Sequence, residues 1–225
     1  MKKIFAISIF VLLIKVSLFA QSVSLEPIAS FGTRQGVNMS FVDFSPAVGN
    51  KLLYGYNGGL VFNYKGEKFF GIQVELNYSQ KGWSEDLDTI QNSYSRQLNY
   101  IELPFLTHIY FGNRDLNYFA NLGTSVAYLV SEKETAEINN ELYIHKYYDK
   151  KIDNNFDFNI VGELGISYLT TIGTFQFGAR YYYSLTSIFD YDSKTIDYDS
   201  KTMPYNVSRN QVINISLTYF LTSKK

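Results

Sequence analysis

The segment INISLTYFL, residues 213–221, alternates apolar and polar side chains along most of its length. Its apolar set is Ile213, Ile215, Leu217, Tyr219 and Leu221, and the polar residues between them are Asn214, Ser216 and Thr218. A period of two indicates a β-strand, because successive side chains of a strand point to opposite faces. The segment therefore predicts a strand with one apolar face and one polar face.

Seven more segments show the same alternation: residues 31–41, 57–64, 70–79, 99–111, 118–130, 158–168 and 174–184. The chain is rich in tyrosine (20) and phenylalanine (18), with four prolines, which is a β composition. We expect eight strands of roughly nine to twelve residues, the length that crosses a bilayer at a tilt. Pro104 cannot donate a ladder hydrogen bond, so we expect a bulge there.

The connections between these segments alternate between short and long. The short links are residues 65–68, 112–115 and 170–173, and the long links are residues 42–53, 81–97, 131–155 and 185–209. An up-and-down barrel with both termini at the short-turn end has this pattern. In outer-membrane barrels the short turns face the periplasm and the long loops face outward.

Periodicity alone does not say which face is inside, since a soluble lipocalin-like barrel alternates with its apolar face inward. Here the apolar face is bulky and uncharged, and the polar face holds many glycines, which suits a narrow lumen. Tyrosines lie near strand ends on the apolar face, as in interfacial girdles: Tyr64, Tyr78, Tyr118, Tyr128, Tyr168 and Tyr219. We therefore predict an all-β fold, an eight-stranded antiparallel up-and-down transmembrane β-barrel. The soluble barrel is the alternative.

The polar face carries charged residues, which this assignment places in the lumen: Arg34, Glu75, Glu102, His108, Glu163 and Arg180, with Lys81 nearby. Unpaired buried charges are costly, so these groups are expected to pair. A catalytic or proton-relay cluster is one interpretation. A structural network that fills the lumen and fixes the register is the interpretation we favour. Trp83, the single tryptophan, is expected in an interfacial girdle.

The N-terminal segment MKKIFAISIFVLLIKVSLFA has a positive start, an apolar run and a small final residue. This order predicts a signal peptide over residues 1–20, with residues 21–225 as a single outer-membrane β-barrel domain. A transmembrane anchor is the rival reading. Cleavage of the signal peptide would remove its three lysines and leave 17 basic and 21 acidic residues. The resulting net charge of −4 argues against binding to nucleic acid. The absence of cysteine excludes disulfides and thiolate metal sites.

Three stretches carry a family resemblance: GTRQGVNMS (32–40), ELNYSQKG (75–82) and YIELPFLTHIYF (100–111). With these, the chain resembles the PorT-like outer-membrane β-barrel proteins of Gram-negative bacteria. His108 stands where the family pattern usually has lysine. The resemblance implies an integral outer-membrane barrel and little about activity. It raises an accessory role in a secretion or surface complex.

The repeat DYDSKTIDYDSKT, residues 190–202, lies in the last long link. It is too short for a coiled coil, and Lys194 occupies a position that a calcium loop needs for an oxygen ligand. A weak surface cation site is one alternative, and a duplicated loop segment is the reading we favour. Neither His108 nor His145 has a serine and carboxylate arranged for nucleophilic chemistry, so we expect no enzyme, no cofactor and no metal.

The sequence thus predicts a secreted outer-membrane barrel with a plugged lumen and a structural or interaction role through its long outer loops. The expected partners are outer-membrane lipid and an unidentified protein at the loops. The alternative is a small-molecule or lipid-binding barrel, either in the membrane or soluble.

Overall fold

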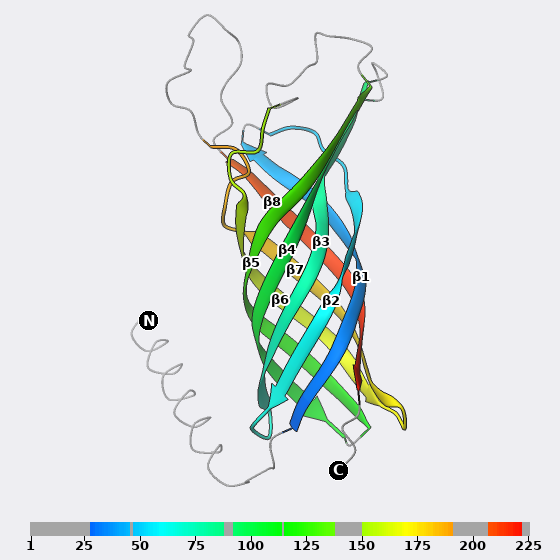
Figure 1. The fold of residues 1–225 in the computed structure, drawn as a ribbon. Coiled ribbons are helices and arrows are strands. Elements are labelled where there is room, and N and C mark those ends of the chain that lie inside the picture. Colours follow the sequence, from blue (N-terminus) through cyan, green and yellow to red (C-terminus); the bar gives the residue numbers. More distant parts are fainter. Residues whose placement is uncertain are drawn as a thin grey trace, which may run out of the picture.

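The computed structural model describes residues 28–45, 47–87, 92–113, 115–137, 150–190 and 207–221. These residues form eight strands: β1 (Ile28–Ser45), β2 (Leu53–Lys65), β3 (Phe70–Leu87), β4 (Asn92–Gly112), β5 (Leu116–Glu137), β6 (Phe156–Leu169), β7 (Gly173–Ser184) and β8 (Val207–Leu221). Each strand pairs antiparallel with its sequence neighbours, and β8 pairs with β1 to close the barrel (Figure 1). The predicted fold class is confirmed.

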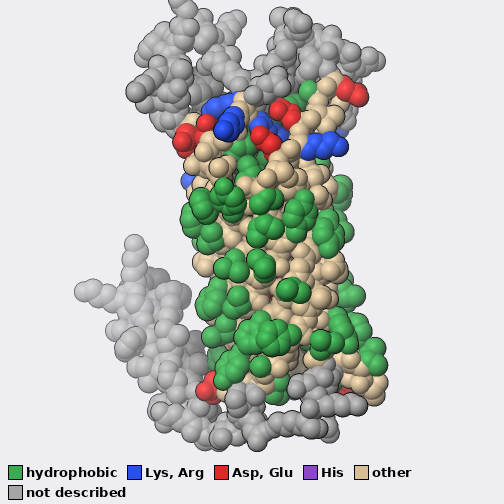
Figure 2. Space-filling model, in the orientation of Figure 1, with side chains coloured by type: hydrophobic (Ala, Val, Ile, Leu, Met, Phe, Trp, Pro, Cys, Tyr) green, Lys and Arg blue, Asp and Glu red, His purple; other side chains and the backbone are tan. Residues whose placement is uncertain are grey.

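The two ends of the barrel differ, as the sequence predicts. β1 begins and β8 ends at the lower end in Figure 1, where the tight β2–β3, β4–β5 and β6–β7 turns also lie. The strand ends that the other four connections join lie at the opposite end, near which charged side chains gather (Figure 2). No helix long and apolar enough to cross a membrane occurs in the described part of the chain, a finding that does not bear on strands.

The predicted assignment of faces is confirmed by burial. Bulky apolar side chains point outward and cover the wall (Figure 2), and Leu164 is 69% exposed. The polar alternates point inward and are buried, as are the seven charged or histidine residues predicted for the lumen. Tyr64, Tyr118 and Tyr168 are exposed near the ends of their strands, as expected of girdle residues, and Tyr128 is exposed in the middle of β5.

The predicted length of nine to twelve residues holds for β7, which has 12, but is too short for the other strands, of which β5 is the longest with 22. The link predicted over residues 81–97 is largely a hairpin, in which β3 and β4 stay paired out to Leu87 and Asn92. β5 likewise continues to Glu137 opposite Ser93. In the part of a strand that extends beyond the bilayer, the outward face can carry polar side chains, although the same face is apolar within the bilayer. The hydrophobic pattern therefore ends before the strand does.

The bulge predicted at Pro104 is also misplaced. Pairing of β4 with β5 runs without a shift from Leu103 to Phe105, and the shift lies between Asn99 and Tyr100. There Asn99 pairs with Ser131 and Tyr100 with Leu129, so Val130 is an extra residue in β5. Pro104 instead falls where the pairing of β3 with β4 is interrupted, between Phe105 and Glu102, which accommodates its missing N–H.

Two predicted features lie outside the described residues. These are the signal peptide over residues 1–20 and the part of the DYDSKT repeat that follows Asp190.

Candidate functional site

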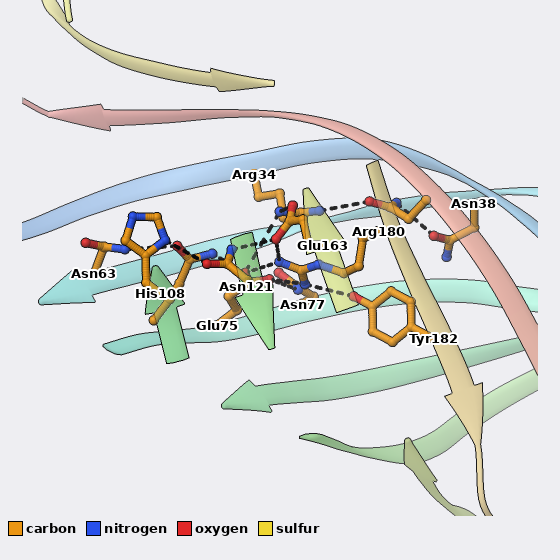
Figure 3. Close-up of polar contacts among 12 residues, drawn as sticks. Arg34, Asn38, Asn63, Glu75, Asn77, His108, Asn121, Glu163, Arg180 and Tyr182 are labelled. Atoms are coloured by element: carbon orange, nitrogen blue, oxygen red, sulfur yellow. Dashed lines mark hydrogen bonds and ion pairs between the residues drawn. The ribbon is translucent and has the colours of Figure 1, made fainter. Parts of the chain in front are cut away.

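Four charged side chains from four strands meet inside the barrel. Arg34 comes from β1, Glu75 from β3, Glu163 from β6 and Arg180 from β7 (Figure 3). Each is at most 3% exposed. Because the strands lie on different sides of a closed ring, this cluster crosses the lumen.

The charges in this cluster alternate in sign. The guanidinium of Arg180 holds both oxygens of Glu75, with Nη1–Oε2 at 2.9 Å and Nη2–Oε1 at 2.5 Å. Its Nη2 also donates to Glu163 Oε2 at 2.7 Å. Arg34 donates to the other oxygen of Glu163 at 2.8 Å and lies 3.9 Å from Glu75. Two arginines and two glutamates thus neutralise one another, which buried charges require.

Amide side chains add further hydrogen bonds to these charges, although the Nε atoms of Arg34 and Arg180 have no partner among the described residues. Asn121 donates to Glu163 at 2.7 Å, Asn77 to Glu75 at 2.8 Å, and Asn214 accepts from Arg34 at 2.9 Å. Gly178 lies two residues before Arg180 on β7, and its missing side chain leaves the space that Glu163 occupies. A Cβ there would stand 2.6 Å from Glu163 Oε1. The glycine-rich polar face is therefore matched to the volume of the charged side chains.

His108 lies below this cluster and joins it through one amide. Asn121 uses its Nδ2 on Glu163, so its Oδ1 accepts the 2.6 Å hydrogen bond from His108 Nδ1. The imidazole packs between Tyr110 and Phe119, with ring centroids 5.4 and 5.5 Å away. His108 therefore makes a neutral hydrogen bond and no ion pair.

Glu102 belongs to a second cluster, nearer the outer end. Lys81 Nζ lies 3.0 Å from Asp157 and 3.8 Å from Glu102, and it faces the ring of Tyr100 at 4.8 Å. Ser125 donates to Glu102 at 2.7 Å. The predicted set of six residues is thus divided: Arg34, Glu75, Glu163 and Arg180 meet, and Glu102 and His108 lie apart from them.

Above the second cluster large apolar side chains join the remaining inward charges, Glu85 and Arg96. A cluster of buried apolar residues lies at this end of the barrel, and we call it the outer cap: Val42, Phe44, Trp83, Tyr94, Leu98, Tyr100, Ala127, Ile152, Ile188 and Phe189. Trp83 is fully buried, with Phe44 and Phe189 edge-on to it at 5.5 and 6.3 Å. The prediction of Trp83 as a girdle residue is wrong. Its parity, shared with Lys81, points it into the barrel.

Two outer connections are fastened onto the cap. Ile152 comes from the β5–β6 connection, and Ile188 and Phe189 come from the β7–β8 connection. Asn154 links the two by donating to Ser187 O at 2.9 Å and to Asp190 Oδ1 at 2.7 Å. Asp153 accepts from the Asp190 backbone N–H at 2.9 Å. The first residue of the predicted repeat is therefore held in place.

Charged groups on the cap rim also pair. Arg96 bonds Glu132 at 2.7 Å and the Lys150 carbonyl at 2.6 Å. Burial would lower the pKa of Arg96, but its bond to Glu132 and the nearby Tyr94 and Glu134 raise it. Burial also raises the pKa of Tyr94, which donates to Glu134. The extra residue Val130 places Glu132 and Glu134 on the same face as Arg96.

The sequence pattern contains a signal for two inward residues that the prediction did not place inside, Asp157 and Trp83. Asp157 and Trp83 each continue the inward parity of a recognised segment by one step, past Asn159 and past Lys81. The sequence contains no such signal for the cap contacts of Ile152, Ile188 and Phe189, because these residues lie in connections without hydrophobic alternation.

The buried acidic and basic groups mostly satisfy each other. Within the described ranges, no group of three or more His, Cys, Asp or Glu side chains is arranged to hold a metal ion. The carboxylates of Glu75 and Glu163 face guanidiniums rather than an open space. This arrangement suits mechanical cross-linking of strands.

Comparison with known proteins identifies one family and several solved structures of similar fold. Residues 19–190 match the model of the outer membrane protein beta-barrel domain. No curated protein matches the sequence closely enough to count as a relative. Among solved structures, the attachment invasion locus protein Ail of Yersinia pestis is 11% identical, covering 86% of this chain and 99% of its own, with a TM-score of 0.43.

Two further structures are similar at the same level. Neisserial surface protein A is 12% identical, with 85% of this chain and 98% of its own covered and a TM-score of 0.42. The N-terminal barrel of Pseudomonas aeruginosa OprF is 7% identical, with 85% and 97% covered and a TM-score of 0.36. The family match spans more than half of the chain and agrees with the closed eight-stranded barrel. The chain belongs to the outer membrane protein beta-barrel domain family, and it is an outer-membrane β-barrel protein.

Proposed function

We propose that this barrel is a closed, non-enzymatic scaffold that holds its outer connections at the cell surface for a protein partner. The observation that carries the proposal is the Arg34–Glu163–Arg180–Glu75 cluster, which crosses the lumen with its charges satisfied. The outer cap adds a second, apolar closure above it.

The fastened connections support the display of a surface. Asp153, Asn154 and Asp190 tie the β5–β6 and β7–β8 connections together, so the segments that leave them start from fixed points. A fixed start lowers the conformational entropy that a binding loop loses when it meets a partner. We further infer that residues 1–20 are a signal peptide. The resemblance to PorT-like proteins supports a partner in a secretion or surface complex.

The first test is conductance. Purified barrel inserted into a planar bilayer is expected to give no sustained current. A variant without the closures, Arg34→Ala combined with Phe189→Ala, is expected to raise ion flow. A steady, ion-selective current through the unaltered protein would overturn the plugged lumen.

The competing function is a small-molecule or lipid binder. It predicts a rise in the melting temperature of the barrel when the ligand is added, because binding to the folded state stabilises it. Screening lipids and small metabolites by melting, with no shift found, is the result expected from a scaffold.

A further inference from the structure

At mid-height on β1 the wall that faces the lipid carries a carboxamide, Gln35. Gln35 points outward between Phe31 and Phe41, the outward aromatics nearer the two ends of the strand. Its cross-strand neighbours on the same face are Leu217 on β8 and Gly58 on β2. A polar group on this surface must find its hydrogen bonds within protein, because hydrocarbon offers none.

Gln35 is only half satisfied. Its Oε1 accepts from the hydroxyl of Tyr56, which folds over Gly58 to reach it. A side chain at position 58 would collide with that hydroxyl, so the glycine is needed for this contact. Among the described residues Nε2 has no partner, and the side chain is exposed. Two amide hydrogens therefore face the bilayer.

An apolar groove adjoins Gln35 on the same wall. It has a volume of about 480 Å³ and runs obliquely from β8 across β1, β2 and β3 to β4. It follows the gap between two rows of outward residues, one containing Phe31, Phe62 and Val74 and the other Thr33, Leu60 and Leu76. Thr33 is the smallest side chain of these rows, and it is two residues from Gln35 on the same face.

We propose that two copies of this chain associate within the membrane through the β1–β2 wall, with Gln35 at the two-fold axis. A carboxamide is self-complementary, because it has two N–H donors and an oxygen with two lone pairs. Each Nε2 donates to the opposite Oε1, which keeps its bond from Tyr56. The groove of each copy then receives apolar side chains of the other.

A second copy accounts for both features of the wall, whereas a lipid accounts for one. An acyl chain fills the groove but has no acceptor for the amide hydrogens of Gln35. Apolar contact alone gives little drive in a bilayer, where lipid tails are as apolar as leucine. A closed two-fold contact uses the same patch twice, so one glutamine and one groove are sufficient.

The absence of cysteine makes a direct test available. Thr33→Cys and Val37→Cys flank Gln35, and Thr124→Cys on β5 is an outward control on another part of the wall. Each variant is oxidised with copper phenanthroline in native outer membranes and run without reductant. Strong dimer bands are expected from at least one flanking position, and only a background band from Thr124→Cys.

The second arm asks whether the carboxamide is responsible. Gln35→Leu in the Val37→Cys and Thr33→Cys backgrounds is expected to reduce the dimer band to the Thr124→Cys level, with the heat-modifiable monomer intact. Equal cross-linking at all three positions overturns the proposal, as does cross-linking that survives Gln35→Leu. Native mass spectrometry showing monomers that carry a phospholipid would assign the groove to lipid and also overturn it.

Discussion

The inward face of the barrel has opposite chemistry in its two halves. Within the bilayer β3 directs Glu75, Asn77, Ser79 and Lys81 inward, and two residues later the same face holds Trp83. On β1 the change comes after Ser40, where Val42 and Phe44 follow. The parity is unbroken, but the lower half is lined largely by charged and amide side chains, whereas in the upper half large aromatic side chains surround the remaining charges Glu85 and Arg96.

The medium outside the wall explains this difference. In the bilayer apolar side chains face lipid, and the polar ones are left to fill the interior. Above it the outside is water, so burying apolar surface inside becomes favourable, as in a soluble domain. The comparison teaches that the solvent around a strand, rather than the strand itself, decides which face is polar.

The largest effect is expected in the ionic half. Glu163→Gln leaves Arg34 and Arg180 sharing one carboxylate, and we expect it to lower the free energy of unfolding by about 4 kcal/mol. Urea unfolding in lipid vesicles, read by the heat-modifiable band, measures it. Glu132→Gln on the cap rim is the matched control, with an expected loss below about 1 kcal/mol because Glu132 is partly exposed. Equal losses would contradict the division into two halves.

The aromatic half is tested by Phe189→Ala. Removing this ring from the buried cap should cost about 3 kcal/mol and loosen the cap while the barrel stays inserted. Trp83 is the only tryptophan, so a red shift of its emission reports the change directly. Phe156→Ala removes an exposed outward ring and should leave the emission unchanged. A shift in that control would show that the fluorescence follows the whole barrel.

A charged substitution on the outer wall distinguishes the part that faces lipid from the part that faces water. Leu164→Arg should destabilise the inserted state by about 2–3 kcal/mol and reduce assembly, because the side chain faces hydrocarbon. Thr135→Arg, outward on the extension of β5, should assemble normally. Outer-membrane fractionation with and without boiling measures both. Normal assembly of Leu164→Arg would contradict the assignment of the lipid face.

The smallest effect is a pH dependence of the cap. Burial would raise the pKa of Asp153, but its bonds from Lys150 and the Asp190 N–H lower it below the usual 3.8. The carboxylate therefore stabilises the fold above about pH 4, and this contribution is lost as the pH falls through the lowered value. Trp83 emission should shift slightly in acid, and Asp153→Asn should remove that step. A step that persists in the variant would assign it to another group.

Much of the fold was readable because its cause is local. Alternation predicts the eight strands, the outward tyrosines and the inward position of Arg34 and Glu163, since the period of a strand is two. Strand ends are harder to predict: the pattern predicts a loop over residues 81–97, although Lys81 to Leu87 is paired with β4. There the outward face no longer carries the apolar residues that mark a membrane strand.

The sequence by itself determined the barrel and the inward face of each membrane-spanning strand, including Arg34, Glu75, Glu163 and Arg180, because a bilayer allows only one face of each strand to be polar. The tertiary structure alone decided which of them meet. Arg34 and Glu163 form a hydrogen bond although they are 129 positions apart in the sequence. Lys81 pairs with Asp157, which is not among the residues predicted for the lumen. Barrel closure and strand register set these two contacts, and both depend on all strands together.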